Sequence, residues 1–151
     1  MPSKPAQSIV AFWDTSAIVP LCCLQSRTST ARRAARLYCR QVVWWATPVE
    51  AVSFLERLSR DGHLSGRDRA QAFARLDYLR ERWSEVQPSD DVRNQAEQML
   101  RLHRLRAADA IQLASALVWC SNQPRGRYFI GADNRLLDAA EIKGFNIIRL
   151  L

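Results

Sequence analysis

The sequence contains few of the residues that build zinc sites and disulfide frameworks. It has four cysteines and two histidines in 151 residues. Cys22 and Cys23 are adjacent, Cys39 and Cys120 are isolated, and no pair follows the C-x-x-C spacing of metal or redox motifs. The pattern favours reduced cysteines that act as small apolar side chains.

Long hydrophobic runs are also missing. No apolar run approaches the roughly 18 residues that a membrane-spanning helix requires. The first residues, MPSKPAQSIVAF, lack the extended apolar segment of a signal peptide. We therefore expect a soluble cytoplasmic protein that makes no contact with a membrane.

Lysine is scarce, although the chain is strongly basic. Only Lys4 and Lys143 are lysines among 22 basic residues, and the net charge is +7 with a pI near 9.9. This balance favours an anionic partner, either nucleic acid or an acidic protein. An arginine-rich composition can also arise from a GC-rich genome without any demand from function.

The patterning predicts one α/β domain over residues 1–151, with 48% hydrophobic and 25% charged residues. Short runs rich in β-formers predict strands at 8–13, 42–46, 85–87, 127–132 and 145–151. Between them, amphipathic or capped segments predict helices at 16–24, 28–39, 47–62, 64–83, 88–105, 107–121 and 133–144. This alternation indicates a small parallel sheet with helices on both faces and a helical hairpin at roughly 48–83.

Four acidic residues stand beside apolar sequence at the ends of these elements: Asp14, Glu50, Asp109 and Asp133. Asp14 and Asp133 follow strands, and the carboxyl ends of parallel strands are where such sheets bind ligands. A structural explanation exists for each acid. Asp14 and Asp133 could cap the next helix, Thr47 and Glu50 form a capping-box pattern, and Asp109 could pair with Arg106.

Taken together, the acids predict a metal site if the fold brings them to one edge of the sheet. Four carboxylates in one cleft would repel, so they would take up protons or bind cations. Mg²⁺ or Mn²⁺ suits an all-oxygen donor set without Cys or His, and such a metal can activate water against a phosphodiester. With a basic surface to hold phosphates, this combination indicates a nuclease.

Four segments carry a resemblance to a known family: FWDTSAIV, TPVEAVSFLERL, LRAADAIQLASAL and FIGADNRLLDAA. They resemble the four acidic motifs of PIN domains, most closely those of VapC-type toxins of bacterial toxin–antitoxin pairs, and the match runs from Ser8 to Ile148. The resemblance implies Mg²⁺- or Mn²⁺-dependent cleavage of RNA, a homodimer and a cognate antitoxin. By position it implies that Asp14, Glu50, Asp109 and Asp133 are the metal-binding and catalytic acids and that Ser16 supports Asp14.

Two residues depart from the family pattern. Gly131 stands where many relatives have Ser or Thr, and Gln112 replaces a His that is frequent in the third motif. These changes motivate an alternative, a catalytically weak or inactive PIN-like module that binds RNA or protein. A flap-type 5′ nuclease would use the same acids, although 151 residues leave little room for its helical additions.

Several other residues have less specific interpretations. Asn134 could touch the metal shell or a phosphate, or simply occupy the first turn of a helix. The hydroxyl of Thr15 is expected to bond to backbone. The five tryptophans are expected to lie mostly in the core, although some on the helical hairpin could line a groove for an amphipathic antitoxin helix. A solvated face is the expected place of four arginines: Arg32, Arg33, Arg36 and Arg40.

Overall fold

A five-stranded parallel sheet forms the centre of the molecule. The computed structural model describes residues 8–151. Residues 1–7 lie outside the described residues. They are part of the predicted domain and of the N-terminal segment in which we expect no signal peptide. The strands are β1 (Val10–Trp13), β2 (Arg40–Trp44), β3 (Ser84–Val86), β4 (Tyr128–Gly131) and β5 (Asn146–Arg149). All neighbours pair in parallel, which confirms the predicted α/β class.

The strand order marks the junction of β1 and β4 as the point where the winding of the chain reverses. The order is β3-β2-β1-β4-β5, so the chain moves outward from β1 to β3 and then crosses back to the other side of β1. The direction of winding therefore reverses between β1 and β4. In open parallel sheets, ligands bind beyond the carboxyl ends of the strands at such a reversal.

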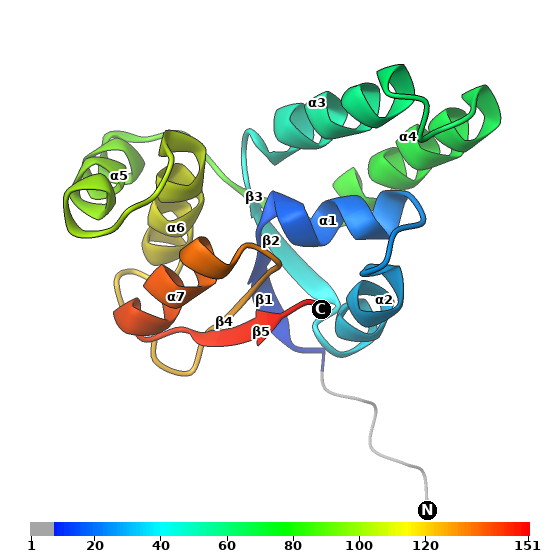
Figure 1. Cartoon of the computed structure of the whole chain (residues 1–151). Coiled ribbons are helices and arrows are strands. Elements are labelled where there is room, and N and C mark those ends of the chain that lie inside the picture. The colour runs from blue at the N-terminus through cyan, green and yellow to red at the C-terminus, as the bar shows by residue number, and fades with distance from the viewer. Residues whose placement is uncertain (1–7) are drawn as a thin grey trace, which may run out of the picture.

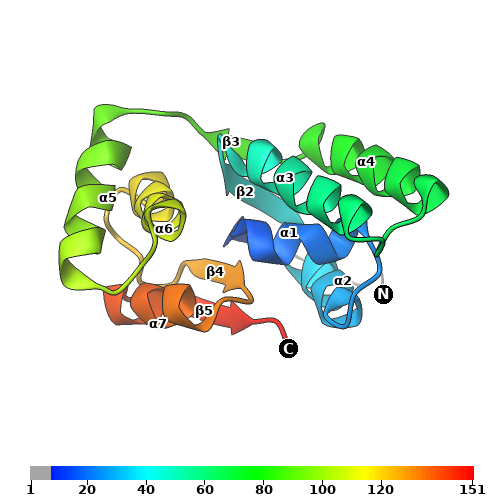
Figure 2. The same ribbon diagram turned by 45° about the horizontal axis from the view of Figure 1, so that its top comes forward.

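Helices cover both faces of the sheet, as the alternating pattern predicts (Figures 1 and 2). One side carries α1 (Thr15–Cys22), α2 (Thr28–Leu37), α3 (Thr47–Arg60) and α4 (Gly66–Arg80). The other carries α5 (Asp90–Leu102), α6 (Ala107–Trp119) and α7 (Asn134–Lys143). Two hydrophobic cores result, because side chains alternate along each strand. In β1, Phe12 packs into the core under α5–α7, whereas Ala11 and Trp13 pack into the core under α1–α4.

The predicted helical hairpin is α3 and α4, which lie side by side and project away from the sheet (Figures 1 and 2). Ser65 caps α4 as the capping-box pattern predicts, because its Oγ accepts a hydrogen bond of 3.1 Å from the amide of Asp68. Trp83 at the end of the hairpin is buried, whereas Trp45 before it is 49% exposed. Four of the five tryptophans therefore contribute to or pack against the core, as expected.

Over residues 8–151, each helix is too short or too polar to cross a membrane. The last helix, α7, ends at Gly144, whose φ of 114° is left-handed and favours glycine. The turn after it leads directly into β5. This stop was readable from the sequence, because glycine is the residue that most easily takes this conformation.

Candidate active site

The four acids predicted from the sequence line a single cavity of about 370 Å³, which we call the acidic cavity. Asp14 directly follows β1 and Asp133 precedes α7 in the loop after β4, so both lie at the reversal of strand order. Glu50 and Asp109 enter from the first turns of α3 and α6. The expected convergence of the four side chains is therefore what the fold produces.

Asp14 is held at the bottom of the cavity by Ser16. The carboxylate is only 4% exposed, and its Oδ2 accepts hydrogen bonds from the amide of Ser16 at 3.2 Å and from its hydroxyl at 2.5 Å. The same hydroxyl accepts a bond of 2.9 Å from the amide of Ala132, in the loop after β4. Asp14 thus caps α1 and also lines the cavity, so its capping role does not exclude a place among the cavity acids.

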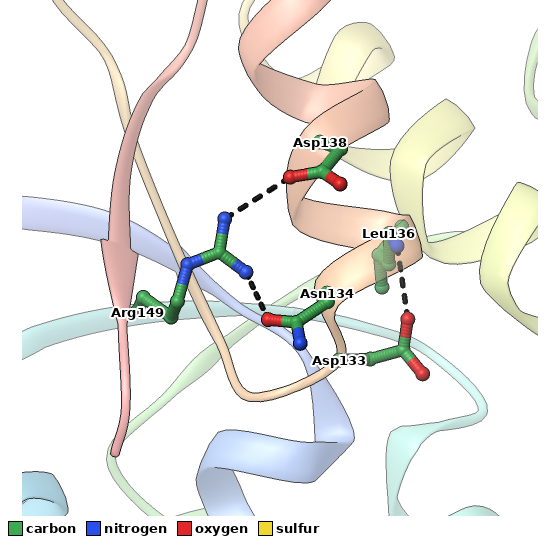
Figure 3. Close-up of polar contacts among 5 residues, drawn as sticks. All are labelled: Asp133, Asn134, Leu136, Asp138 and Arg149. Atoms are coloured by element: carbon green, nitrogen blue, oxygen red, sulfur yellow. Dashed lines mark hydrogen bonds and ion pairs between the residues drawn. The ribbon is translucent and has the colours of Figure 1, made fainter.

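Asp133 has the same double role at the start of α7 (Figure 3). Its Oδ1 accepts a hydrogen bond of 2.9 Å from the amide of Leu136, which caps the helix, and the side chain is exposed to the cavity. Its neighbour Asn134 points elsewhere, because Asn134 Oδ1 accepts a hydrogen bond from Arg149, which also contacts Asp138 at 3.1 Å. The supporting role expected for Asn134 stays a prediction.

Glu50 is held by a network of side chains centred on Gln112. The amide nitrogen of Gln112 donates to Glu50 Oε1 at 3.1 Å and to the hydroxyl of Thr15 at 2.9 Å. The Thr15 hydroxyl in turn donates to Glu50 Oε2 at 3.3 Å. Both carboxylate oxygens of Glu50 are therefore engaged by donors. The expectation that the Thr15 hydroxyl bonds to backbone was wrong, because it joins this network instead.

The predicted capping box at Thr47 and Glu50 is also wrong. Thr47 is itself the first residue of α3, and the preceding residue, Ala46, makes no side-chain cap. The hydroxyl of Thr47 instead lies 3.4 Å from the Gln112 amide nitrogen, and Glu50 points into the acidic cavity. The signal for Gln112 was available in the sequence. It is an amide side chain three residues after Asp109, in a helix whose other residues after Asp109 are apolar except for Ser115, and the structure buries it fully.

Burial raises the pKa of three carboxyl groups in the cavity, those of Asp14, Glu50 and Asp109. Burial raises the pKa of Asp14 to about 6, although the hydrogen bonds from Ser16 oppose this and repulsion from Asp109 adds to it. Burial also raises the pKa of Glu50 to about 7, with repulsion from Asp14 adding to the shift and donors from Gln112 and Thr15 opposing it. The pKa of Asp109 rises through burial and the nearby charge of Asp133. Such a cluster gains most from a bound cation.

The donor chemistry of the cavity fits a hard divalent cation. All four acids offer carboxylate oxygens, neither Cys nor His lines the cavity, and one carboxylate, Asp14, is nearly inaccessible to bulk water. Among residues 8–151, however, no three His, Cys, Asp or Glu side chains are grouped closely enough to hold an ion as they stand. Coordination would therefore draw the carboxylates closer together.

Gly131 leaves room beside this cluster. A Cβ built on it would lie 3.4 Å from Leu137 Cδ2 and 3.5 Å from the hydroxyl of Ser16, both ordinary contacts or close to them. A larger residue at position 131 would therefore lie beside Ser16. With glycine there, the surroundings of Asp14 differ from the family pattern, and the hydrogen bond from Ser16 to Asp14 is still formed.

The chain matches known proteins in family and in fold. The family model for the PIN domain matches residues 11–141. A structure from Pyrobaculum aerophilum, described as PAE2754, superposes with a TM-score of 0.61 at 20% identity, over 95% of this chain and 92% of that one. A toxin–antitoxin complex from Klebsiella pneumoniae contains a chain that superposes with a TM-score of 0.58 at 15% identity, over 83% and 88%.

No curated protein sequence matches the chain significantly. At 15 to 20% identity the two solved structures establish the fold, which is the three-layer arrangement predicted from the sequence. The family model covers most of the chain, including Asp14, Glu50, Asp109 and Asp133. The chain therefore belongs to the PIN domain family.

Proposed function

We propose that this protein is a metal-dependent endoribonuclease that acts as the VapC-type toxin of a toxin–antitoxin pair. The observation that carries the proposal is the convergence of Asp14, Glu50, Asp109 and Asp133 in one cavity at the reversal of strand order. PIN domains are typically nucleases, so membership of the family supports hydrolysis of a phosphodiester. The net charge of +7 supports a polyanionic substrate, which we take to be RNA.

The four carboxylates are the groups that would hold Mg²⁺ or Mn²⁺. When bound, such a cation supplies an activated water and neutralises charge on the phosphate. The protein contributes the positions of the acids: Ser16 fixes Asp14, and Gln112 with Thr15 orients Glu50. In the proposed hydrolysis, water oxygen bonds to phosphorus, the bridging P–O bond breaks, and a carboxylate takes the proton of the water while the leaving oxygen gains one.

The proposed partners are RNA, a cognate antitoxin and a second copy of the chain. A toxin–antitoxin complex from Klebsiella pneumoniae shares the fold, which supports an antitoxin partner for this chain. A homodimer and a cytoplasmic location are proposed from the resemblance to VapC-type toxins and from the RNA substrate.

Induced expression in a bacterial host tests this proposal. Wild-type protein should arrest growth and produce new RNA 5′ ends, which sequencing of those ends would map. An Asp14→Asn variant, expressed to the same level, should do neither. The proposal is contradicted if wild type creates no new RNA ends, or if Asp14→Asn creates the same ones.

One observation favours a second candidate, an inactive PIN-like module that binds RNA or protein. Among the described residues, no three of the acids lie close enough together to hold an ion as they stand, and an inactive module would keep them only for stability. In that case Asp14→Asn would lower the melting temperature, and Mn²⁺ would leave the melting temperature unchanged. The nuclease proposal expects Mn²⁺ to raise the melting temperature, because the cation binds the folded state alone.

A further inference from the structure

A second cavity adjoins the acidic cavity and has a different character. It has a volume of about 910 Å³ and shares part of its wall, Asp109, Ala132 and Asp133, with the acidic cavity. The rest of its wall includes three arginines, so we call it the arginine cavity: Arg104, Arg106 and Arg135. They come from the segment before α6 and from the first turn of α7, on the β4 side of the acids.

The three arginines are available to a ligand. Each is exposed, and over residues 8–151 none of the three makes a side-chain hydrogen bond or an ion pair. Arg149, by contrast, is occupied by Asn134 and Asp138 beside the same helix. Guanidinium groups bind phosphate oxygens through paired N–H donors. Three exposed guanidinium groups in a single cavity therefore have the donor chemistry that phosphates require.

We propose that the arginine cavity binds the sugar-phosphate backbone of the RNA strand next to the bond that is cleaved. This inference rests on the proposed nuclease function. A phosphodiester placed at the four acids belongs to a polymer. The neighbouring phosphates of the strand must therefore lie outside the acidic cavity, along its open sides. The arginine cavity is continuous with the acids on one side, and Arg27 lines the acidic cavity together with α1 and α3 residues.

The arginines also answer an electrostatic problem of this site. The carboxylates that would hold the metal repel a polyanion, and Asp109 and Asp133 extend that repulsion into the shared wall. Three guanidinium groups against these two carboxylates leave the arginine cavity net positive. The RNA strand is therefore attracted to the arginine cavity beside the acids. A neighbouring phosphodiester of the same strand then lies over the acidic cavity.

Charge-matched triple variants test the proposal. The first replaces the cavity arginines (Arg104→Gln, Arg106→Gln and Arg135→Gln), and the control replaces Arg33, Arg36 and Arg40 with Gln. The control residues are exposed and line neither cavity, and Arg40 begins β2 at the amino end of the sheet, opposite the acids. Both variants are made in an Asp14→Asn background to keep the RNA intact. Circular dichroism melts check that both are folded.

The readout is the dissociation constant of a fluorescently labelled single-stranded RNA, measured by anisotropy across a range of salt concentrations. Loss of three phosphate contacts should reduce the slope of log K against log salt by about 2, since each contact on a single strand contributes about 0.7. The dissociation constant should rise about tenfold or more in the cavity variant. The control variant should keep the slope of the Asp14→Asn parent.

The other outcomes overturn the inference in distinguishable ways. Equal slopes for the two triple variants would mean that the arginine cavity does not hold the strand, even if the wild-type protein cleaves RNA. A variant that keeps RNA affinity but loses affinity for polyglutamate would assign the cavity to an acidic protein segment instead. If the protein with Asp14 intact fails to cleave RNA, the proposed function fails, whatever the slopes are.

Discussion

Gln112 joins three parts of the chain that are distant in sequence. Its amide nitrogen reaches Thr15, at the start of α1, and Thr47 and Glu50, in the first turn of α3. Its Oε1 is buried with no hydrogen-bond partner in the described residues. An unpaired buried carbonyl costs free energy, and the hydrogen bonds of the amide nitrogen to Glu50 and its neighbours offset that cost.

Replacing Gln112 should therefore weaken metal binding more than it affects folding. In Gln112→Leu, Glu50 loses a donor that stabilises its charged form, so its pKa rises further and protons compete better with the metal. We expect the Mn²⁺ affinity at pH 7 to fall about tenfold or more, measured by isothermal titration calorimetry. The loss should shrink at pH 9, where Glu50 is ionised in both proteins.

Ser115→Ala is the matched control for this experiment. Ser115 is buried in the same helix, and its hydroxyl donates to the carbonyl of Ile111 rather than to any residue of the acidic cavity. The control should keep wild-type Mn²⁺ affinity. If Gln112→Leu binds Mn²⁺ as tightly as the control at pH 7, the positioning role of Gln112 is disproved.

The stability of the metal-free protein should depend on the charge of Asp14. Its folded pKa of about 6 lies above the ordinary value of 3.8, so the folded state binds protons more tightly than the unfolded state. Ionised Asp14 therefore lowers the free energy of unfolding. This loss of stability is absent below pH 4, grows as the pH rises through 6 and is complete above it. Asp14→Asn removes it and should stabilise the metal-free protein at pH 8 by about 1–3 kcal/mol, as measured by urea denaturation.

The stability that Asp14→Asn gains at pH 8 should vanish at pH 4, where Asp14 is protonated in the folded protein. Asp138→Asn serves as the control, because Asp138 is exposed and Arg149 is its one ion-pair partner among residues 8–151. A destabilised Asp14→Asn at pH 8 would show that the carboxylate is kept as a helix cap for α1, which would favour the inactive module.

At the scale of elements, the sequence predicts the sheet well but misses how α3 begins. Strand ends such as Asp14 and Asp133 were readable because a polar residue after a short apolar run marks the carboxyl edge of a buried parallel strand. The start of α3 was misread because capping rules consider only the nearest residues. The hydroxyl of Thr47 binds a partner 65 residues away, and no local rule contains that information.

The turn between α1 and α2 depends on the hydroxyl of Thr28, which a substitution can test. The hydroxyl of Thr28, which is buried, donates to the carbonyl of Pro20 and accepts from the amide of Gln25 at 2.8 Å. Thr28→Val leaves both backbone groups unpaired and should lower the free energy of unfolding by about 1–3 kcal/mol in urea denaturation. Residues 25–27 line the acidic cavity, so RNA cleavage should also slow.

Ser29→Ala is the control, because it removes a hydroxyl from the same turn of α2 at an exposed position with no side-chain hydrogen bond in the described structure. Its stability should stay within about 0.5 kcal/mol of wild type. Equal stabilities for Thr28→Val and Ser29→Ala would mean that Thr28 does not hold this turn together.

At the scale of the whole molecule, composition and periodicity were enough to predict the α/β class, and the five-stranded parallel sheet confirms it. The acids could be predicted as a set because each lies at an element end that a parallel sheet brings to the same edge. The arginine cavity could not be predicted. Its residues are separated by about thirty positions, and they resemble any other exposed arginines until α6 and α7 are placed side by side.

The proposed homodimer would bury apolar side chains that the single chain exposes. Several apolar side chains around α3, including Trp45, Val49 and Phe54, are exposed in the single chain, and a partner surface would remove them from water. Multi-angle light scattering after gel filtration should give about twice the 17.3 kDa of one chain. A mass of one chain at micromolar concentration would contradict the dimer, without bearing on the acids.

The proposed activity is cleavage of RNA with a divalent cation held at the four carboxylates of the acidic cavity. The most direct measurement incubates purified protein with a labelled single-stranded RNA in Mg²⁺ or Mn²⁺, with EDTA, and with Asp14→Asn or Asp109→Asn in place of wild type. We expect cleavage by wild type with metal, and none in EDTA or with either variant. Cleavage that persists in EDTA, or that survives loss of Asp14, would contradict it.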